Sequence, residues 1–369
     1  MTNIIMNTLV QSYLIIILVI ISLAATPLAS NGTSGSSSGS AGSSVPEAIE
    51  GEPHVDEWVS WKEKYNKQYA SEDEEVERFL IWQENLEKVQ MHNSQSGDQP
   101  EQSFSGVRLG MNEYADFTQQ EFLDTLLGHR ILPMMIPDDS GSGEGQAMMV
   151  GEGEVPEEQD WREKGYVTSV KYQDHCGSCW AFSAAGALEG QYFNKTGQLV
   201  DLSAQQMLDC TDNSDCSGGN VEFALKYLIE RGSISDHDYP YTADDTQPCM
   251  DQNMDIVTTM SSYDKIPKGD EEKLREAVGL IGPVSAAIDS AHFAFQFYES
   301  GVFYEPNCDP DALNHSVLIV GYGTSETGEE YWIVKNTWGA DWGMDGYFRL
   351  ARNRENNCGI ASYSMYPVI

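Results

Sequence analysis

Cys179 stands in a setting that suits a thiol nucleophile. It follows a Cys-Gly-Ser tripeptide and begins an alanine-rich run that continues to Phe193 and stops near Gly197. This composition predicts a helix that begins at Cys179, and glycine is the residue type that commonly ends a helix. A thiol attacks a carbonyl carbon only as a thiolate, and the N-terminus of a helix favours an anion. We therefore predict that Cys179 acts as a nucleophile in acyl transfer.

A histidine and an asparagine downstream can complete this chemistry. His315 opens an apolar run bounded by glycines, which predicts a buried strand, and Asn336 follows a second predicted strand over 331–335. An imidazolium beside the thiolate would stabilise it and later protonate a leaving amine. The carbonyl of Asn336 can accept a hydrogen bond from the imidazole and fix its tautomer. Gln173 and the backbone N–H of Cys179 can donate to a developing oxyanion.

Each of these residues also has an ordinary structural explanation when it is taken alone. A lone Cys179 would be a small buried hydrophobe or half of a disulfide. A lone histidine at the end of a strand is more often a satisfied core or surface residue, and a lone asparagine is more often a cap or part of a turn. The joint context of the four residues favours catalysis over these alternatives.

The chain resembles the papain family of cysteine proteases, and within it the cathepsin L branch, from about residue 55 to the C-terminus. Gln173, Cys179, His315 and Asn336 each lie in a matching local context, the last in an Asn-Thr-Trp-Gly run, and a Gly-Met-Asp-Gly-Tyr run follows at Gly343. The resemblance implies an α+β fold, with a helical domain and a β-barrel-like domain on either side of a V-shaped cleft. It also implies an endopeptidase that hydrolyses peptide bonds through a thioester acyl-enzyme.

Two other functions are alternatives to an endopeptidase. An exopeptidase of the same family would need an added element that blocks one end of the cleft, and the sequence shows neither a paired-His insertion nor a minichain of the kinds such enzymes carry. A non-catalytic homologue that serves storage or inhibitor binding would ordinarily have lost the nucleophile or the histidine. Both residues are present here.

The resemblance further implies which residues contact the substrate. Gly218 and Gly219 resemble a glycine strip that pairs with the substrate backbone, although a simple turn is the alternative. Trp338 would shield Asn336 and border the substrate. Four residues would line the pocket for the second residue before the scissile bond, namely Val221, Ala287, Leu313 and Tyr363. Tyr363 at its base would favour Leu, Val or Met over Arg or Trp; alternatively, it belongs only to the C-terminal core.

Composition limits the cofactors and partners. Seven cysteines in an exported chain leave one unpaired, and the sequence alone leaves the connectivity of the other six open. We expect no metal and no other cofactor, because no Cys/His cluster has the spacing of a zinc site. The net charge of −37 argues against a nucleic-acid partner, because phosphates would be repelled. The resemblance implies three disulfides, which join Cys176 with Cys216, Cys210 with Cys249, and Cys308 with Cys358.

The sequence of the N-terminal segment predicts that the protein is exported. Residues 1–25 include an apolar run of 13 residues from Tyr13 to Ala25, which is short for a membrane span and suits a cleaved signal peptide. Since Lys and Arg are absent before this run, a retained anchor is the alternative. Residues 26–54 are predicted to be a Ser/Gly-rich linker. We expect a monomer in the secretory pathway, bound for a lysosome, a vacuole or the outside of the cell, without a stable membrane anchor after cleavage.

Three Asn-X-Ser/Thr sequons occur in the chain. Asn31 and Asn194 are predicted glycosylation sites. Asn314 is formally a third, but a glycan beside His315 would block the cleft, so we expect it to be unmodified.

Residues 55–132 are predicted to be a mainly helical prosegment. Six residues recur at steps of four, four, three, four and four and would line one helix face, namely Glu74, Arg78, Trp82, Asn85, Val89 and Asn93. This spacing resembles the ERFNIN pattern of cathepsin L-type propeptides. A second propeptide element appears as Gly110, Asn112, Tyr114 and Asp116. The resemblance implies that this segment is an intramolecular inhibitor, that 133–154 is a processing segment, and that 155–369 is the mature peptidase acting on protein or peptide substrates.

Acid activation, which the resemblance also implies, needs an ionised group whose interactions weaken on protonation. Prosegment and mature part are both rich in acidic residues, so their docking is expected to rest on apolar burial and a few specific contacts rather than on bulk charge. Asp116 is our candidate for this ionised group, and the acidic run Glu72–Glu75 is the alternative.

Overall fold

The computed structural model describes residues 45–95, 106–127 and 153–369. The predicted signal, most of the linker with Asn31, and most of the processing segment lie outside the described residues. No helix in the described part of the chain is long and apolar enough to cross a membrane. Residues Pro46–Ile369 form a single unit, in which residues 46–127 contact the C-terminal part (153–369). Residues 46–127 comprise the end of the predicted linker and the described part of the predicted prosegment, and they are called the prosegment below.

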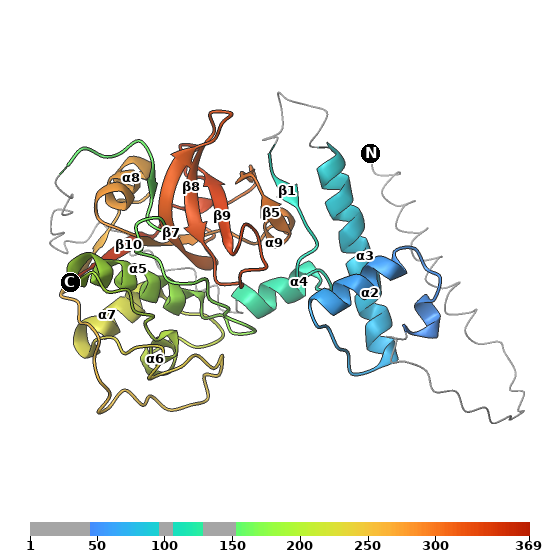
Figure 1. The fold of residues 1–369 in the computed structure, drawn as a ribbon, viewed down its shortest axis with the longest axis horizontal. Coiled ribbons are helices and arrows are strands. Elements are labelled where there is room, and N and C mark those ends of the chain that lie inside the picture. Colours follow the sequence, from blue (N-terminus) through green and yellow to red (C-terminus); the bar gives the residue numbers. More distant parts are fainter. Residues whose placement is uncertain (1–44, 96–105, 128–152) are drawn as a thin grey trace, which may run out of the picture. The chain divides into compact units, whose positions relative to one another are not determined.

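The prosegment is mainly helical, as the sequence pattern predicts. Its elements are η1 (Glu47–Ile49), α2 (Val55–Lys64), α3 (Glu72–Gln95), β1 (Arg108–Leu109), α4 (Gln119–Phe122) and η2 (Leu123–Leu127) (Figure 1). Trp58 and Trp61 of α2 stack with ring centroids 5.2 Å apart, and both rings pack against Trp82 of α3. Burial of these large rings supplies a core for the two helices.

One face of α3 holds the segment that runs from β1 to α4. Asn93 exchanges two hydrogen bonds with the backbone of Leu109, and Asn85 donates to two backbone carbonyls of the turn that follows. Arg78 donates to the backbone carbonyl of Asp116 at 3.1 Å. The polar positions of the predicted motif thus satisfy backbone groups that no regular element pairs. The remaining motif positions cap the start of α3 or are buried in its packed face: Glu74, Trp82 and Val89.

The prosegment docks through backbone pairing and apolar contacts. β1 pairs antiparallel with β5 (Tyr298–Ser300) of the C-terminal part. The side chain of Asn112 donates to the carbonyl of Gln296 at 2.6 Å, and the side chain of Gln296 donates back to the carbonyl of Tyr114 at 3.2 Å. Arg108 and Glu299 also form an ion pair, but their exposed side chains make it weak.

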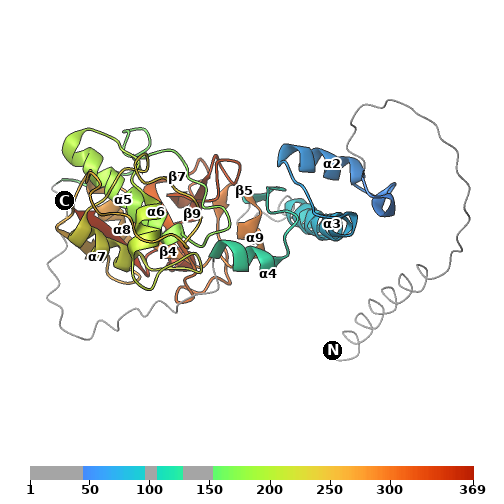
Figure 2. The ribbon, with the colours of Figure 1, turned by 90° about the horizontal axis from the view of Figure 1, so that it is seen from below.

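α5 (Cys179–Thr196) is the central helix of the C-terminal part. It begins at Cys179 and ends at Gly197, which has a φ of +72°, as the sequence predicts. α6 (Ala204–Cys210) and α7 (Val221–Arg231) pack against it (Figures 1 and 2). α5 also contacts strand β7 (His315–Thr324), where a Cβ added at Gly186 would meet the side chain of Leu318 at 2.7 Å. Small residues on α5 therefore allow the helix to approach the sheet closely.

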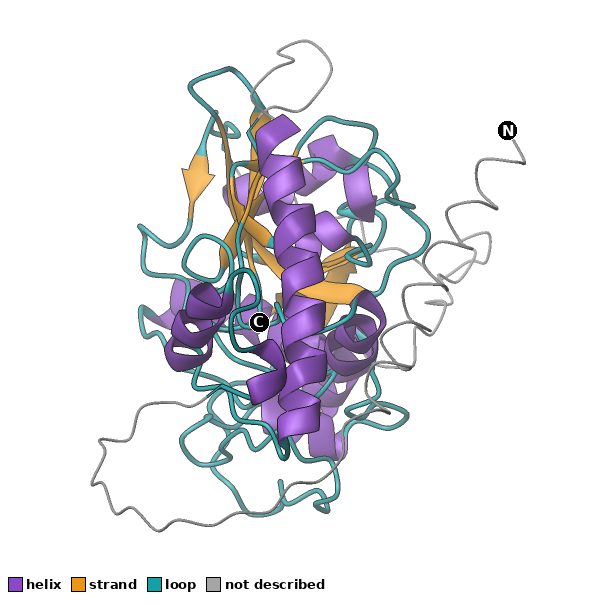
Figure 3. Cartoon of the chain, turned by 90° about the vertical axis from the view of Figure 1, so that its right-hand side faces the viewer, coloured by secondary structure: helices purple, strands orange, loops and turns teal. Residues whose placement is uncertain are grey.

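The second half of the C-terminal part is built on an eight-stranded sheet. Its strands are orange in Figure 3, as are the two strands of the smaller β1–β5 sheet. Its strand order is β3-β10-β4-β7-β8-β9-β6, with β2 paired to β7. The strands other than β7 are β2 (Gln159–Asp160), β3 (Ser262–Lys265), β4 (Val284–Ile288), β6 (Val302–Phe303), β8 (Glu330–Lys335), β9 (Tyr347–Ala351) and β10 (Ser364–Val368). Short helices accompany them: α8 (Glu271–Leu280), α9 (Phe293–Gln296) and η3 (Asn357–Gly359). This separation of helices and strands is the α+β fold that we predicted.

Three disulfides cross-link the C-terminal part. They join the same pairs that the resemblance implied, namely Cys176–Cys216, Cys210–Cys249 and Cys308–Cys358. Cys179 is the free cysteine. The first disulfide ties the residues before α5 to the turn that carries Gly218 and Gly219.

Candidate active site

Cys179 is the first residue of α5, with Ser178 as the N-cap. Its side chain is 5 % exposed, and its sulfur accepts a hydrogen bond from the backbone N–H of Ser316 at 3.4 Å. Ser316 follows His315 at the start of β7. This hydrogen bond therefore brings together the helix and the strand that carry the two predicted catalytic groups.

The imidazole of His315 is fixed on two sides. Its Nε2 lies 2.8 Å from Oδ1 of Asn336, and because an amide oxygen only accepts, the proton resides on Nε2. The ring also stacks on Trp338, with centroids 4.7 Å apart and an interplanar angle of 26°. Nδ1 is buried without a hydrogen-bond partner in the described part of the chain. Nδ1 thus keeps a lone pair that can accept a proton from a thiol.

Gln173 is fully buried, and its amide group is oriented by Thr337. Oε1 of Gln173 accepts from the hydroxyl of Thr337 at 2.5 Å, so Nε2 is the end that is free to donate. Nε2 donates to the carbonyls of Leu126 at 2.9 Å and Cys176 at 2.8 Å. Leu126 belongs to the prosegment. A prosegment carbonyl therefore occupies the donor that the sequence predicted for the oxyanion.

Burial controls the ionisation of the two central groups in this covered state. It raises the pKa of the Cys179 thiol to about 11, although the backbone N–H of Ser316 opposes the shift. Burial also lowers the pKa of the His315 imidazole to about 4, against the effect of the hydrogen bond to Asn336. Near neutral pH both groups are uncharged. In this covered state burial therefore opposes the thiolate–imidazolium pair, which stays a prediction for the processed protein.

We expect the thiol of the unprocessed chain to react slowly with iodoacetamide near neutral pH. Because its folded pKa is raised to about 11, the thiolate fraction should grow only as the pH rises toward that value. Removal of the prosegment should increase the rate near neutral pH, because water then reaches the sulfur. Mass spectrometry of Cys179 alkylation over a range of pH, before and after processing, measures both rates. Identical pH profiles for the two forms would contradict the covered state.

The four residues predicted to line a substrate pocket belong to one apolar cluster. Each is at most 6 % exposed, and the set is Val221, Ala287, Leu313 and Tyr363. The backbone N–H of Ala287 donates to the carbonyl of Tyr363 at 3.0 Å. The phenol of Tyr363 donates to Oδ1 of Asn220 at 2.8 Å, so Tyr363 is more than an apolar core residue.

The predicted glycine strip lies just before Val221, the first of these four residues, in the sequence. Gly218 exchanges two backbone hydrogen bonds with Asp215, which closes a tight turn. A side chain at Gly219 would collide with the indole of Trp180 in α5. Glycine is therefore required at Gly219 by packing, whatever its role toward a substrate.

Two residues of this site were not found from the sequence. The hydroxyl of Tyr241 donates to the backbone carbonyl of Gln173 at 2.8 Å and lies 2.6 Å from the hydroxyl of Ser178. No local signal points to Tyr241, because its loop reaches the site only through the tertiary fold. Thr337, which orients Gln173, does carry a signal, since it adjoins Asn336 in the Asn-Thr-Trp-Gly run.

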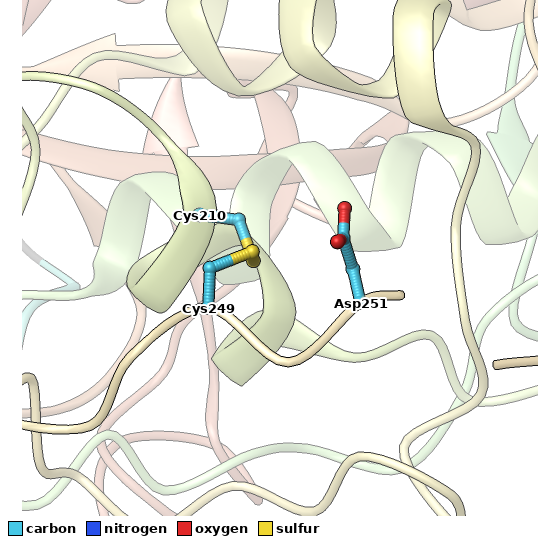
Figure 4. A group of neighbouring side chains, drawn as sticks. All are labelled: Cys210, Cys249 and Asp251. Carbon is cyan, nitrogen blue, oxygen red and sulfur yellow. A yellow bond between two sulfur atoms is a disulfide. The ribbon is translucent and has the colours of Figure 1, made fainter. Parts of the chain in front are cut away.

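Two groups of potential metal ligands do not form metal sites. Cys210, Cys249 and Asp251 place their ligand atoms within 4.8 Å of one another (Figure 4). However, the two sulfurs are bonded to each other, and the carboxylate accepts hydrogen bonds from Arg231 and a neighbouring tyrosine. A second group includes Cys308, which is also in a disulfide. Neither group offers a thiolate to a metal.

The two described sequons differ in their surroundings. Asn194 is exposed near the end of α5, and its side-chain oxygen accepts from the hydroxyl of Tyr166. The side-chain nitrogen of Asn314 donates to Asp289 at 2.8 Å, and its oxygen accepts from the backbone N–H of Ser290. The amide of Asn314 is thus engaged in internal hydrogen bonds, and the absence of a glycan there stays a prediction.

Comparisons with known proteins cover both parts of the chain. A family model described as "Papain family cysteine protease" matches residues 155–368, and one described as "Cathepsin propeptide inhibitor domain (I29)" matches residues 58–122. A cathepsin L-like peptidase of Aedes aegypti is 46% identical over 321 residues, which cover 85% of this chain and 93% of the relative. Cathepsin S of Mus musculus is 43% identical over 337 residues, which cover 89% and 94%. The solved structure of digestive procathepsin L 3 from the Tenebrio molitor larval midgut aligns with a TM-score of 0.74 at 36% identity, covering 86% of this chain and 100% of that chain.

Proposed function

The chain belongs to the papain family of cysteine proteases, and we propose that it hydrolyses internal peptide bonds through a thioester on Cys179. The observation that supports this most strongly is the arrangement around His315. Its Nε2 is held by Asn336, its Nδ1 is free, and the sulfur of Cys179 accepts from the very next residue. These contacts place the thiol beside the strand that begins with a histidine of fixed tautomer, which supports the proposed roles of nucleophile and base.

In the proposed reaction, Nδ1 of His315 accepts the thiol proton while the sulfur of Cys179 attacks the carbonyl carbon of the scissile bond. The oxyanion accepts hydrogen bonds from Nε2 of Gln173 and from the backbone N–H of Cys179. The imidazolium then gives its proton to the nitrogen of the leaving amine as the C–N bond breaks, which leaves a thioester. Water, deprotonated by His315, attacks the thioester, and the carboxylic acid departs as the thiol re-forms. Asn336 keeps the imidazole in the productive tautomer, and Trp338 covers this hydrogen bond.

The prosegment contains a cathepsin propeptide inhibitor domain and packs on the C-terminal part. Its Phe122 ring contacts Trp338 with centroids 5.1 Å apart, and its Leu126 carbonyl binds Gln173. These contacts support the proposal that the protein is made as an autoinhibited zymogen, since a substrate carbonyl cannot use Gln173 while Leu126 does. We assign release to cleavage within 133–154, which leaves 155–369 as the mature enzyme.

Asp116→Asn is expected to loosen the prosegment and to move self-processing toward neutral pH. Asp116 is 2 % exposed, with Oδ1 3.0 Å from Nζ of Lys67 and Oδ2 accepting from the hydroxyl of Tyr69 at 2.9 Å. Loss of its charge leaves Lys67 without a counter-ion, a change that costs on the order of a few kcal/mol for a buried pair. The measurement is the pH midpoint of self-processing. Asp56→Asn, which removes an exposed carboxylate from α2, is the control.

An unchanged midpoint in Asp116→Asn would remove this residue from the pH switch. The acidic run Glu72–Glu75 would then be the remaining candidate, since Glu75 pairs with Lys62 inside the prosegment. Either way the contacts lie within the prosegment rather than across its interface. The switch that we propose therefore acts on the folding of the prosegment and only through it on docking.

Tyr363→Ala is expected to widen the substrate pocket toward Phe at the second position before the scissile bond, where the parent should prefer Leu, Val or Met. A misfit of about one methylene costs about 1 to 3 kcal/mol, so the preference for Leu over Phe should fall about tenfold or more. A panel of fluorogenic peptides that differ only at this position measures kcat/KM for both enzymes. A parent profile dominated by Arg would refute the pocket, and an unchanged profile in the variant would exclude Tyr363 from it.

We propose that the protein enters the secretory pathway and acts as a monomer on proteins or peptides, in a lysosome or outside the cell. The apolar run in residues 1–25 and the three disulfides support this proposal, because disulfides persist in oxidising compartments. The four predicted catalytic residues all come from one chain, which supports the proposal of a monomer.

A further inference from the structure

The hydroxyl of Tyr363 is tied to the N-terminus of α7. It donates to Oδ1 of Asn220 at 2.8 Å and lies 3.2 Å from Oε2 of Glu222. The same oxygen of Asn220 accepts from the backbone N–H of Glu222 as the N-cap of α7. The ring of Tyr363, which directly precedes β10, is thereby held against the segment that directly follows Gly218 and Gly219.

The carboxylate of Glu222 is itself immobilised. It accepts from the hydroxyl of Tyr263 at 2.7 Å and pairs with Nζ of Lys265 at 2.7 Å and Nζ of Lys226 at 2.9 Å. Its side chain is 13 % exposed. Burial raises the pKa of Glu222, but the hydrogen bonds from Lys265, Lys226 and Tyr263 outweigh it and hold the pKa at about 2. The carboxylate therefore keeps its charge, and its contacts, in an acidic compartment.

We infer that Asn220 and Glu222 are positioning residues for substrate selection, because they hold Tyr363 and so fix the depth of the pocket. The inference rests on the pocket proposed above and concerns what sets its size. A ring that is tethered through its hydroxyl must give up buried hydrogen bonds before it can move aside for a larger side chain. A ring of the same size without the hydroxyl has no such constraint.

Tyr363→Phe and Glu222→Ala test the tether in the processed enzyme, because the first keeps the ring and the second keeps the hydroxyl. In Tyr363→Phe the ratio of kcat/KM for a Phe substrate to that for a Leu substrate should rise about two- to tenfold, the effect of removing one hydrogen bond. Glu222→Ala should give a smaller rise, since Asn220 still holds the hydroxyl. The variant that carries both changes should match Tyr363→Phe, because without the hydroxyl Glu222 no longer acts on the ring. The gain should appear in KM, with kcat nearly unchanged.

Glu230→Ala removes an exposed carboxylate from the same helix and should leave every ratio unchanged. Active-site titration with a thiol inactivator normalises each preparation to folded enzyme. If Tyr363→Phe and Glu222→Ala keep the parent ratio while Tyr363→Ala raises it, the tether is overturned and the pocket stands. If none of the three changes the ratio, the pocket itself is wrong.

Discussion

Cys179→Ser is expected to abolish peptidase activity, with kcat/KM lower by a factor on the order of 10⁴ or more. A serine hydroxyl is a far weaker nucleophile here, because its pKa is much higher than that of a thiol, so the imidazole of His315 deprotonates it far less readily. Self-processing should stop as well, so the full-length chain should accumulate. The fold should survive, since the backbone N–H of Ser316 can donate to an oxygen as it does to the sulfur.

This comparison needs the prosegment to be absent from both proteins. An unprocessed Cys179→Ser protein would be inactive for a second reason, because the Leu126 carbonyl would still occupy Gln173. A trace of parent enzyme can be added to cleave the prosegment from the variant in trans. A thiol inactivator then inactivates the added parent enzyme before the assay. Thermal unfolding of the two mature proteins checks the fold. Turnover at the parent rate in the processed variant would overturn the role of Cys179.

His315→Ala is expected to be as inactive as Cys179→Ser, whereas Asn336→Ala should be weakened. His315 both accepts and returns the proton, and such a group contributes on the order of 10² to 10⁴ in rate. Asn336 contacts only Nε2, so its loss leaves the base in place but lets the ring turn, which should cost about tenfold to a hundredfold. The measurement is kcat/KM over a range of pH for each processed variant.

The double variant of His315 and Asn336 separates orientation from direct action. If Asn336 works through the imidazole, the double variant should be no less active than His315→Ala alone, because there is no ring left to orient. A further loss in the double variant would give Asn336 a role of its own. Gln191→Ala, at a residue of α5 far along the helix from Cys179, is a suitable control for effects of packing.

The elements that carry the site could be predicted because their signals are local. An alanine-rich run followed by Gly197 defines α5, and the apolar run after His315 defines β7. The spacing of polar residues on α3 likewise predicted one functional face, and the structure shows that face holding the chain between β1 and α4. These features depend on residues that are close in sequence, so periodicity and caps are enough to find them.

What the sequence could not supply depends on contacts between distant segments. Two contacts of Gln173 come from distant segments without a local signature. The hydroxyl of Tyr241, in a loop, donates to its backbone carbonyl, and the carbonyl of Leu126, in the short helix η2, accepts from its side-chain amide. The ionisation of Cys179 could not be predicted either. Helix position favours a thiolate, but burial opposes it, and burial was known only once the fold was known.

The hydrogen bond from Gln173 to Leu126 joins an inhibitor and its target within a single polypeptide. While the chain is intact, the effective concentration of the inhibitor at the site is fixed by covalent connection and does not change on dilution. The first cut turns this into a bimolecular equilibrium, which obeys mass action. Dilution should therefore release activity after the cut but not before it. Because each freed enzyme can cut further chains, the onset of activity should accelerate with time, and its lag should shorten as the total protein concentration rises.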